Sequence, residues 1–249
     1  MIRYGDRMLS RIWLFALVAC SGTSTTKPAD APVNIPGQPG VGAHGLAFYR
    51  HNVNSPPSIA TPALATQATG STMIVSVGRG NRNVFELPTD NKGNTPYQQL
   101  GTEQTYTRYP DSGTALYAFP GMVGGADHVV RNGTPPDDEI TIAAVEVVNG
   151  ARIQQFVWSE ELQAPLTSGS VTTTGPATLV AFWWGDAGVD SNKTAVPNNG
   201  FIVVESILQS GALVQCAVAV KNVSAAGTYD VTWTATPAQG AQLWLVAVQ

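Results

Sequence analysis

Three histidines are the residues of this 249-residue chain best suited to acid–base chemistry. His44 and His51 flank a short apolar run, and His128 follows Asp127. A hydrolytic triad needs a nucleophile held against an imidazole that a carboxylate orients. Neighbouring residues on a strand point to opposite faces, so Asp127 does not orient the imidazole of His128 if both lie on a strand. For the same reason Glu160 and Glu161 cannot face each other across a sugar, as paired glycosidase carboxylates do. Because the chain also lacks a Gly-x-Ser-x-Gly elbow, a hydrolase is only a distant third interpretation, and we expect no enzyme.

Two acidic loops favour calcium over zinc as a metal ligand. The first holds Asp186, Asp190 and Asn192, and the second holds Asp137, Asp138 and Glu139. Calcium takes roughly six to eight oxygen ligands, which long loops at a sandwich edge can supply. No paired Cys or His spacing indicates zinc. Neither loop has the spacing of an EF-hand, and solvated loop acids are the alternative explanation.

Aromatic residues offer a second kind of contact. Trp183 and Trp184 are adjacent, so on a regular strand they point to opposite faces, one into the core and the other available to stack on a sugar ring. Tyr106 and Tyr109 lie in a long polar stretch and are candidate partners in such a site. The alternative is that both faces of the tryptophan strand are covered.

The elements that would position these residues are strands. Short apolar runs alternate with Gly and Pro turn clusters, no sustained 3.6-residue period occurs, and Thr228–Thr236 alternates with a period of two. The same period puts Val214, Cys216, Val218 and Val220 on one face. These patterns predict an all-β fold, an antiparallel β-sandwich of jelly-roll or Ig-like type, over residues 45–249. The candidate strands are 47–49, 73–77, 115–119, 140–148, 153–158, 179–184, 201–208, 213–220, 229–235 and 243–248.

Landmarks recur in the same order at offsets near 100 residues. Thr69-Gly70 matches Thr174-Gly175, and Ser112-Gly113 matches Ser210-Gly211, each before an apolar strand. This recurrence suggests two duplicated halves, although generic sandwich patterning would look similar. With the Asp90–Asn94 turn, the order resembles β-sandwich modules repeated in large bacterial surface proteins and phage tail proteins. That resemblance covers most of Thr61–Gln249 and implies a fold, without an active site.

The first 19 residues read as a targeting segment. Three arginines precede an uncharged run that is too short to span a bilayer. The run ends in Leu17-Val18-Ala19-Cys20-Ser21, which resembles the lipobox of bacterial lipoproteins. The resemblance implies that Cys20 carries a lipid anchor such as palmitate. The alternative is an ordinary cleaved signal that happens to contain a cysteine. Residues 20–44 are rich in Pro, Ser and Thr and read as a tether to the cell envelope, most simply the outer membrane.

Composition excludes some partners. Without residues 1–19, 10 basic and 16 acidic residues remain, a net charge near −6, and no Lys/Arg cluster occurs. Nucleic-acid binding is therefore not expected. Cys216 would be the only thiol left and reads as a small buried hydrophobe. We expect a lipid-anchored, non-enzymatic module for binding, adhesion or structure, with a glycan or protein partner. A carbohydrate-binding lipoprotein is the alternative.

Overall fold

The computed structural model describes residues 32–50, 56–81, 85–133, 139–237 and 240–249. These residues form strands and no helix, so none of them belongs to a helix that could cross a membrane. The first half contains β1 (Gly40–Tyr49), β2 (Ser58–Ala60), β3 (Thr69–Arg79), β4 (Thr89–Asp90), β5 (Gln98–Gln99), β6 (Gln104–Thr105), β7 (Gly113–Val123), β8 (Val130–Gly133) and β9 (Ile140–Val148). The second half contains β10 (Ile153–Glu161), β11 (Leu166–Thr167), β12 (Val171–Thr173), β13 (Ala177–Asp186), β14 (Val196–Pro197), β15 (Ile202–Ile207), β16 (Val214–Val223), β17 (Gly227–Tyr229), β18 (Thr232–Thr234) and β19 (Ala241–Val248).

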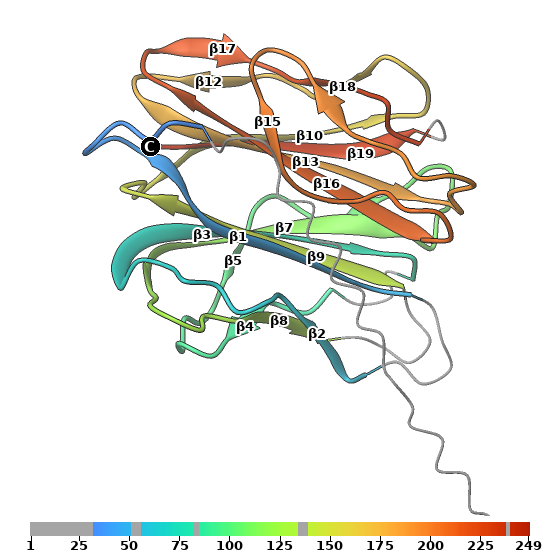
Figure 1. Cartoon of the computed structure of the whole chain (residues 1–249), viewed down its shortest axis with the longest axis horizontal. Helices are drawn as coiled ribbons and strands as arrows, with labels where there is room; N and C mark the ends of the chain where they lie inside the picture. Colours follow the sequence, from blue (N-terminus) through green and yellow to red (C-terminus); the bar gives the residue numbers. More distant parts are fainter. Residues whose placement is uncertain (1–31, 51–55, 82–84, 134–138, 238–239) are drawn as a thin grey trace, which may run out of the picture.

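The strands stack in four layers (Figure 1). Two large central sheets lie face to face, with the orders β1-β9-β3-β7-β5 and β10-β19-β13-β16-β15, and β6 also pairs with β7. The small sheet β2-β8-β4 covers the outer side of the first central sheet. The small sheets β11-β18-β14 and β12-β17 cover the outer side of the second. The prediction of an all-β antiparallel sandwich is confirmed.

Three apolar clusters fill the spaces between the layers. One lies between the two central sheets and includes Ile74, Val145, Phe182 and Val218. The other two lie between each central sheet and its small outer sheet. The central strands are therefore buried on both faces, which explains their continuous apolar runs. Every residue of β9 and of β19 is buried.

The two halves share one topology, which supports the predicted duplication. In each half the first strand lies beside the last, the last pairs on its other side with a central strand (β3 or β13), and that strand pairs with β7 or β16, as in β1-β9-β3-β7 and β10-β19-β13-β16. The small sheets β2-β8-β4 and β11-β18-β14 also correspond. This is the order of a jelly roll. The registers agree as well, because Thr72 pairs with Val147 as Thr178 pairs with Val248.

Corresponding strands of the two halves make approximately reciprocal contacts across the central interface. Strand β1 contacts β15 and β9 contacts β16, while β19 contacts β7 in the reciprocal way. Polar contacts close two sides of the interface. His44 Nδ1 lies 2.8 Å from Glu205 Oε1 on one side, and the Thr107 N–H donates to Glu160 Oε1 (2.8 Å) on the other.

Side-chain sizes at this interface are complementary. An added Cβ on Gly78 of β3 would lie 2.0 Å from Nε1 of Trp184 on β13, so the glycine leaves room for the indole. Trp244 donates its indole N–H to Thr114 Oγ1 (2.8 Å) in the first half. At Gly78 and Thr114 the first half therefore supplies small residues that leave room for indoles of the second half.

Most observed strands extend past the predicted bounds by a few residues, and two of the differences change the interpretation. Strand β1 begins at Gly40, so residues 40–44, which we expected in the tether, pair with β9. The alternating segment Thr228–Thr236 is divided between β17 and β18, because the chain changes its partner there from β12 to β11 and β14. The predicted face of Val214, Cys216, Val218 and Val220 is confirmed, since all four lie in the central cluster.

Candidate functional site

Trp183 and Trp184 point to opposite faces of β13, as expected, but neither indole is exposed. Trp183 is 0 % exposed and packs under the outer sheets, and Trp184 is 1 % exposed at the central interface. The suggestion that one of them stacks on a sugar is therefore corrected. The physical reason is that each face of β13 is covered by another sheet, the alternative raised above.

The two tyrosines are close together but differ in exposure. Tyr106 is fully buried, with its ring in an edge-on contact with Trp184 at 6.0 Å between centroids. Burial is the largest influence on its hydroxyl and raises the pKa of Tyr106 to about 12. Tyr109 is 42 % exposed and its ring lies 6.0 Å from that of Tyr106. Of the four predicted aromatic contacts, only Tyr109 can therefore meet a ligand.

The loop acids are engaged locally and do not converge. Asp190 has a 90 % exposed side chain and forms an ion pair with Lys193 at 3.5 Å, which lowers the pKa of the Asp190 carboxyl. Asn192 Oδ1 accepts the Ser210 N–H (2.8 Å), and Asp186 ends β13 in register with β16. Among the described residues, no three His, Cys, Asp or Glu side chains lie close enough together to hold a metal ion. Glu139 is described, whereas Asp137, Asp138 and His51 lie outside the described residues.

His128 lies in a row of residue types that resembles a hydrolytic triad. Its Nδ1 is 3.1 Å from Thr66 Oγ1, and its Nε2 is 3.3 Å from Asp90 Oδ2, without hydrogen-bond geometry. The side chains of His128 and Asp90 are fully buried, and the Thr66 hydroxyl also accepts the Gly125 N–H (3.0 Å). The imidazole meets no solvent, so the row ties the β2–β3 connection to the loop before β8.

Asp90 is the centre of that polar cluster. Burial raises the pKa of the Asp90 carboxyl, but hydrogen bonds from the Asn94 side chain, the Tyr97 hydroxyl and the Asn94 and Lys92 N–H groups outweigh it. The Asn94 side chain and Tyr97 hydroxyl donate to Oδ2 at 2.8 Å each. The pKa therefore lies below its usual value, and the ionised Asp90 organises the turn predicted at residues 90–94.

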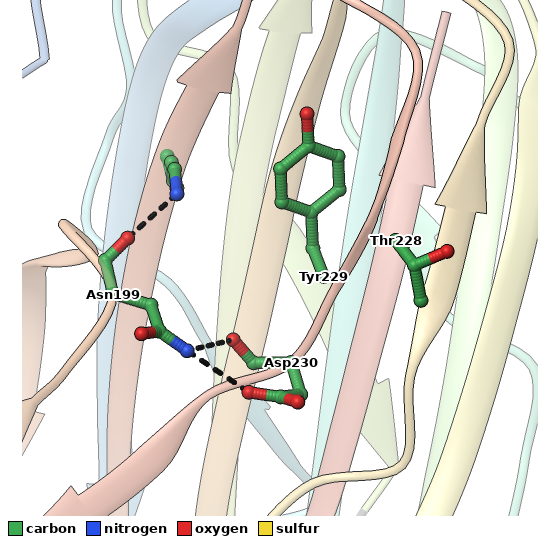
Figure 2. Close-up of a pocket in the computed structure, with 5 residues that line it drawn as sticks. Asn199, Thr228, Tyr229 and Asp230 are labelled. Carbon is green, nitrogen blue, oxygen red and sulfur yellow. Dashed lines mark hydrogen bonds between the residues drawn. The ribbon is translucent and has the colours of Figure 1, made fainter.

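A different group of residues forms an open pocket on the outer side of the second half, hereafter the Lys221 pocket. It has a volume of about 280 Å³. Lys221 comes from the end of β16, Thr228 and Tyr229 from β17, Asp230 from the residue after it, and Asn199 from the turn before β15 (Figure 2). The turn at Asn199 thus meets the end of β16 and the strand that follows it.

Hydrogen bonds fix the polar wall of the pocket. The Lys221 ammonium donates to the Asn199 carbonyl oxygen at 2.6 Å. The Asn199 side-chain N–H group donates to Asp230 Oδ1 at 2.9 Å and to the Asp230 carbonyl at 3.2 Å, as Figure 2 shows. Asn199 has φ 54°, a left-handed conformation that Asn tolerates better than most residues. The turn thereby aims both its carbonyl and its side chain at the neighbouring strands.

An aromatic wall adjoins these polar groups. The Lys221 Nζ atom lies 5.2 Å from the ring centroid of Tyr229 and 5.8 Å from that of Phe201. Such distances allow cation–π attraction, which holds the ammonium between the two rings. The Tyr229 hydroxyl donates to the Ala225 carbonyl at 3.2 Å, and Gly227 leaves space for it. The pocket is therefore preorganised on both walls.

Sequence reasoning missed this pocket. None of its residues forms a local motif, and the only signal was a charged residue, Lys221, directly after the apolar part of β16.

No protein-family model, curated protein or solved structure matches this chain. The class of the protein therefore rests on its topology. The described part is an all-β protein of two jelly-roll sandwiches stacked through their central sheets.

Proposed function

We propose that the protein is a lipid-anchored envelope protein that acts as a non-enzymatic binding module and uses the Lys221 pocket as its binding site. The observation that carries the proposal is the pocket itself, where preorganised charged and polar groups meet an aromatic ring at the surface. Fixed polar groups of this kind set the orientation and the specificity of a bound ligand. The buried Thr66–His128–Asp90 row offers no comparable access.

The place where the tether enters the domain supports the same proposal. The Asn222 side-chain N–H groups donate to the Val33 carbonyl (3.2 Å) and to Asn34 Oδ1 (2.9 Å), and Asn222 directly follows Lys221. The pocket and the tether are thus at one end of the second half. If Cys20 is acylated, the chain from Cys20 to Pro32 spans at most about 40 Å, which keeps the pocket near the membrane.

Fractionation tests the anchor. Cys20→Ala removes the thiol that lipidation requires, and we expect the variant to leave the membrane fraction. Acyl chains contribute roughly 0.8 kcal/mol per buried CH₂, far more than a surface patch of this acidic protein. Unchanged membrane partitioning of the variant would end the lipoprotein hypothesis.

Envelope binding tests the pocket. Soluble Cys20→Ala protein is incubated with isolated envelopes, and Lys221→Met is introduced to remove the ammonium but keep the apolar stem. Lys193→Met is the matched control, because the Lys193 ammonium pairs with Asp190 and does not line the pocket. We expect Lys221→Met alone to lose binding. Equal binding by both variants would contradict the use of the pocket.

A further inference from the structure

We infer that the Lys221 pocket holds one neutral pyranose ring of a glycan. This inference rests on the proposed binding function and names the class of its ligand. The saccharide would bind on the outer side of the second half, away from the central interface. The residues of this site do not include the buried Trp183 and Trp184.

The charges of the pocket favour a neutral ligand. Lys221 and Asp230 both line it, and Asn199 connects them through its carbonyl oxygen and its side-chain N–H group. An anionic ligand near Lys221 would meet the Asp230 carboxylate, and a cation near Asp230 would meet the ammonium. Removing an ionic ligand from water is costly, and the pocket residue of the same charge would repel it. An anion or a cation would therefore gain little binding free energy here.

The hydrogen-bonding groups that remain fit hydroxyls. An ammonium has three N–H donors and a carboxylate has two oxygens. The internal bonds use one donor of Lys221, Asp230 Oδ1 and the N–H side of the Asn199 amide. Asp230 Oδ2, Asn199 Oδ1 and the other N–H groups of Lys221 take no part in these bonds, and Thr228 also lines the pocket. Such a mixed set suits vicinal hydroxyls, because each hydroxyl both donates and accepts.

The shape of the pocket fits a single ring. Tyr229 is held by its hydroxyl and supplies the small apolar part of a mostly polar lining, which an apolar C–H group of a pyranose can contact. The volume of about 280 Å³ lies just below the roughly 300–1,000 Å³ typical of sites for larger ligands. One residue of a glycan would enter, and the rest of the glycan would remain outside.

The first half lacks this site, although it has the same fold. Met73 of β3 occupies the place of Leu179 of β13, and their partners on the next strand are Phe119 and Lys221. Phe119 packs on Tyr97 with 5.4 Å between ring centroids. An apolar contact thus stands where the second half has its ammonium. The pocket is a feature of the second half alone rather than a property of the repeated topology.

The test uses full-length Cys20→Ala protein and measures binding to neutral hexoses, N-acetylhexosamines and uronic acids by calorimetry. Vesicles of phosphatidylethanolamine with and without a neutral glycolipid distinguish a membrane-linked glycan from a soluble one. Lys221→Met and Asp230→Ala each remove hydrogen bonds to a charged group, so we expect each to weaken saccharide binding about tenfold or more. Tyr109→Ala, which removes an exposed tyrosine outside the pocket, serves as control and should bind as before.

Binding of a neutral saccharide, free or on glycolipid, that Lys221→Met weakens and Tyr109→Ala does not would support the inference. No binding of any neutral saccharide, tighter binding of uronic acids, or equal loss in the Tyr109→Ala control would overturn it. Thermal unfolding of each variant confirms that the fold is intact. If envelope binding still depends on Lys221 while neutral saccharides fail to bind, the ligand class is wrong and the proposed binding function stands.

Discussion

The contact between Gly78 and Trp184 gives a stringent test of how the two halves fit together. In an ordinary strand, Gly→Ala stabilises a protein by about 0.4–1 kcal/mol, because alanine has less conformational freedom in the unfolded chain. At position 78 the added Cβ would lie 2.0 Å from Nε1 and 2.3 Å from Cδ1 of Trp184. Carbon contacts are normally about 3.5–4.0 Å, so the indole would have to move by about 1.5 Å.

Trp184 has little space for such a movement. It is 1 % exposed and its ring contacts Tyr106 edge-on. Overpacking of this kind costs typically about 1–3 kcal/mol, and a closely confined ring places the cost near the upper value. Subtracting the entropic gain, we expect Gly78→Ala to lower the free energy of unfolding by about 2 kcal/mol.

Urea denaturation followed by far-ultraviolet circular dichroism measures this loss, and a double-mutant cycle assigns it. Trp184→Val should cost about 3–5 kcal/mol by itself, as for other truncations of a buried tryptophan. In the Trp184→Val background, Gly78→Ala should become neutral or slightly stabilising, a coupling of about 2–3 kcal/mol. Gly188→Ala is the control, because an added Cβ there meets nothing within 4 Å. A loss from Gly78→Ala that persists without the indole, or no loss at all, would refute the reasoning.

Three further predictions concern the cores. Asp90→Asn should destabilise the protein at neutral pH and less so in acid. The pKa of the Asp90 carboxyl in the folded protein lies below its usual value of about 3.9, so the stability that the carboxylate contributes is present above about pH 4 and is lost as the pH falls through the folded pKa. Thermal unfolding of both proteins at pH 7 and pH 3 measures the difference. Trp233→Ala should cost about 3–5 kcal/mol and Thr232→Ala, on the half-buried face of β18, about 1, and similar melting temperatures for the two would contradict the assigned faces. Burial raises the pKa of the Cys216 thiol, so a thiol reagent should label it only after unfolding, and rapid labelling of the native protein would disprove its burial.

Much of the fold was readable because local patterns and burial agree. The predicted strand 140–148 has the bounds of β9, since a run buried on both faces is apolar throughout and ends at turns. The face of Val214 and Cys216 followed from the period of two. The number of sandwiches was not readable in the same way. Apolar runs show that a strand is covered on both sides, but they do not identify the covering sheet.

The candidate site was largely unreadable, for a related reason. Tryptophans suggested a surface contact, yet the fold buries Trp183 and Trp184 because a four-layer stack has two internal central sheets. The Lys221 pocket depends on a strand end, an edge hairpin and a turn that meet only through long-range pairing. The Thr66–His128–Asp90 row likewise joins three segments across the first sandwich. The spacing of residues in the sequence does not predict which segments come together in this way.

The hydrogen bonds between Asn222 and the Val33–Asn34 segment have a mechanical consequence. In a protein tethered through its N-terminus, tension from a ligand held at Lys221 would enter next to Asn222 and leave through Val33. Part of the load would cross the end of β16 through these hydrogen bonds, and the covalent chain would carry the rest through Asn34 into β1, which pairs with β9. Resistance to pulling would then have two successive parts, first the few bonds of Asn222 and, after they break, the pairing of β1 with β9.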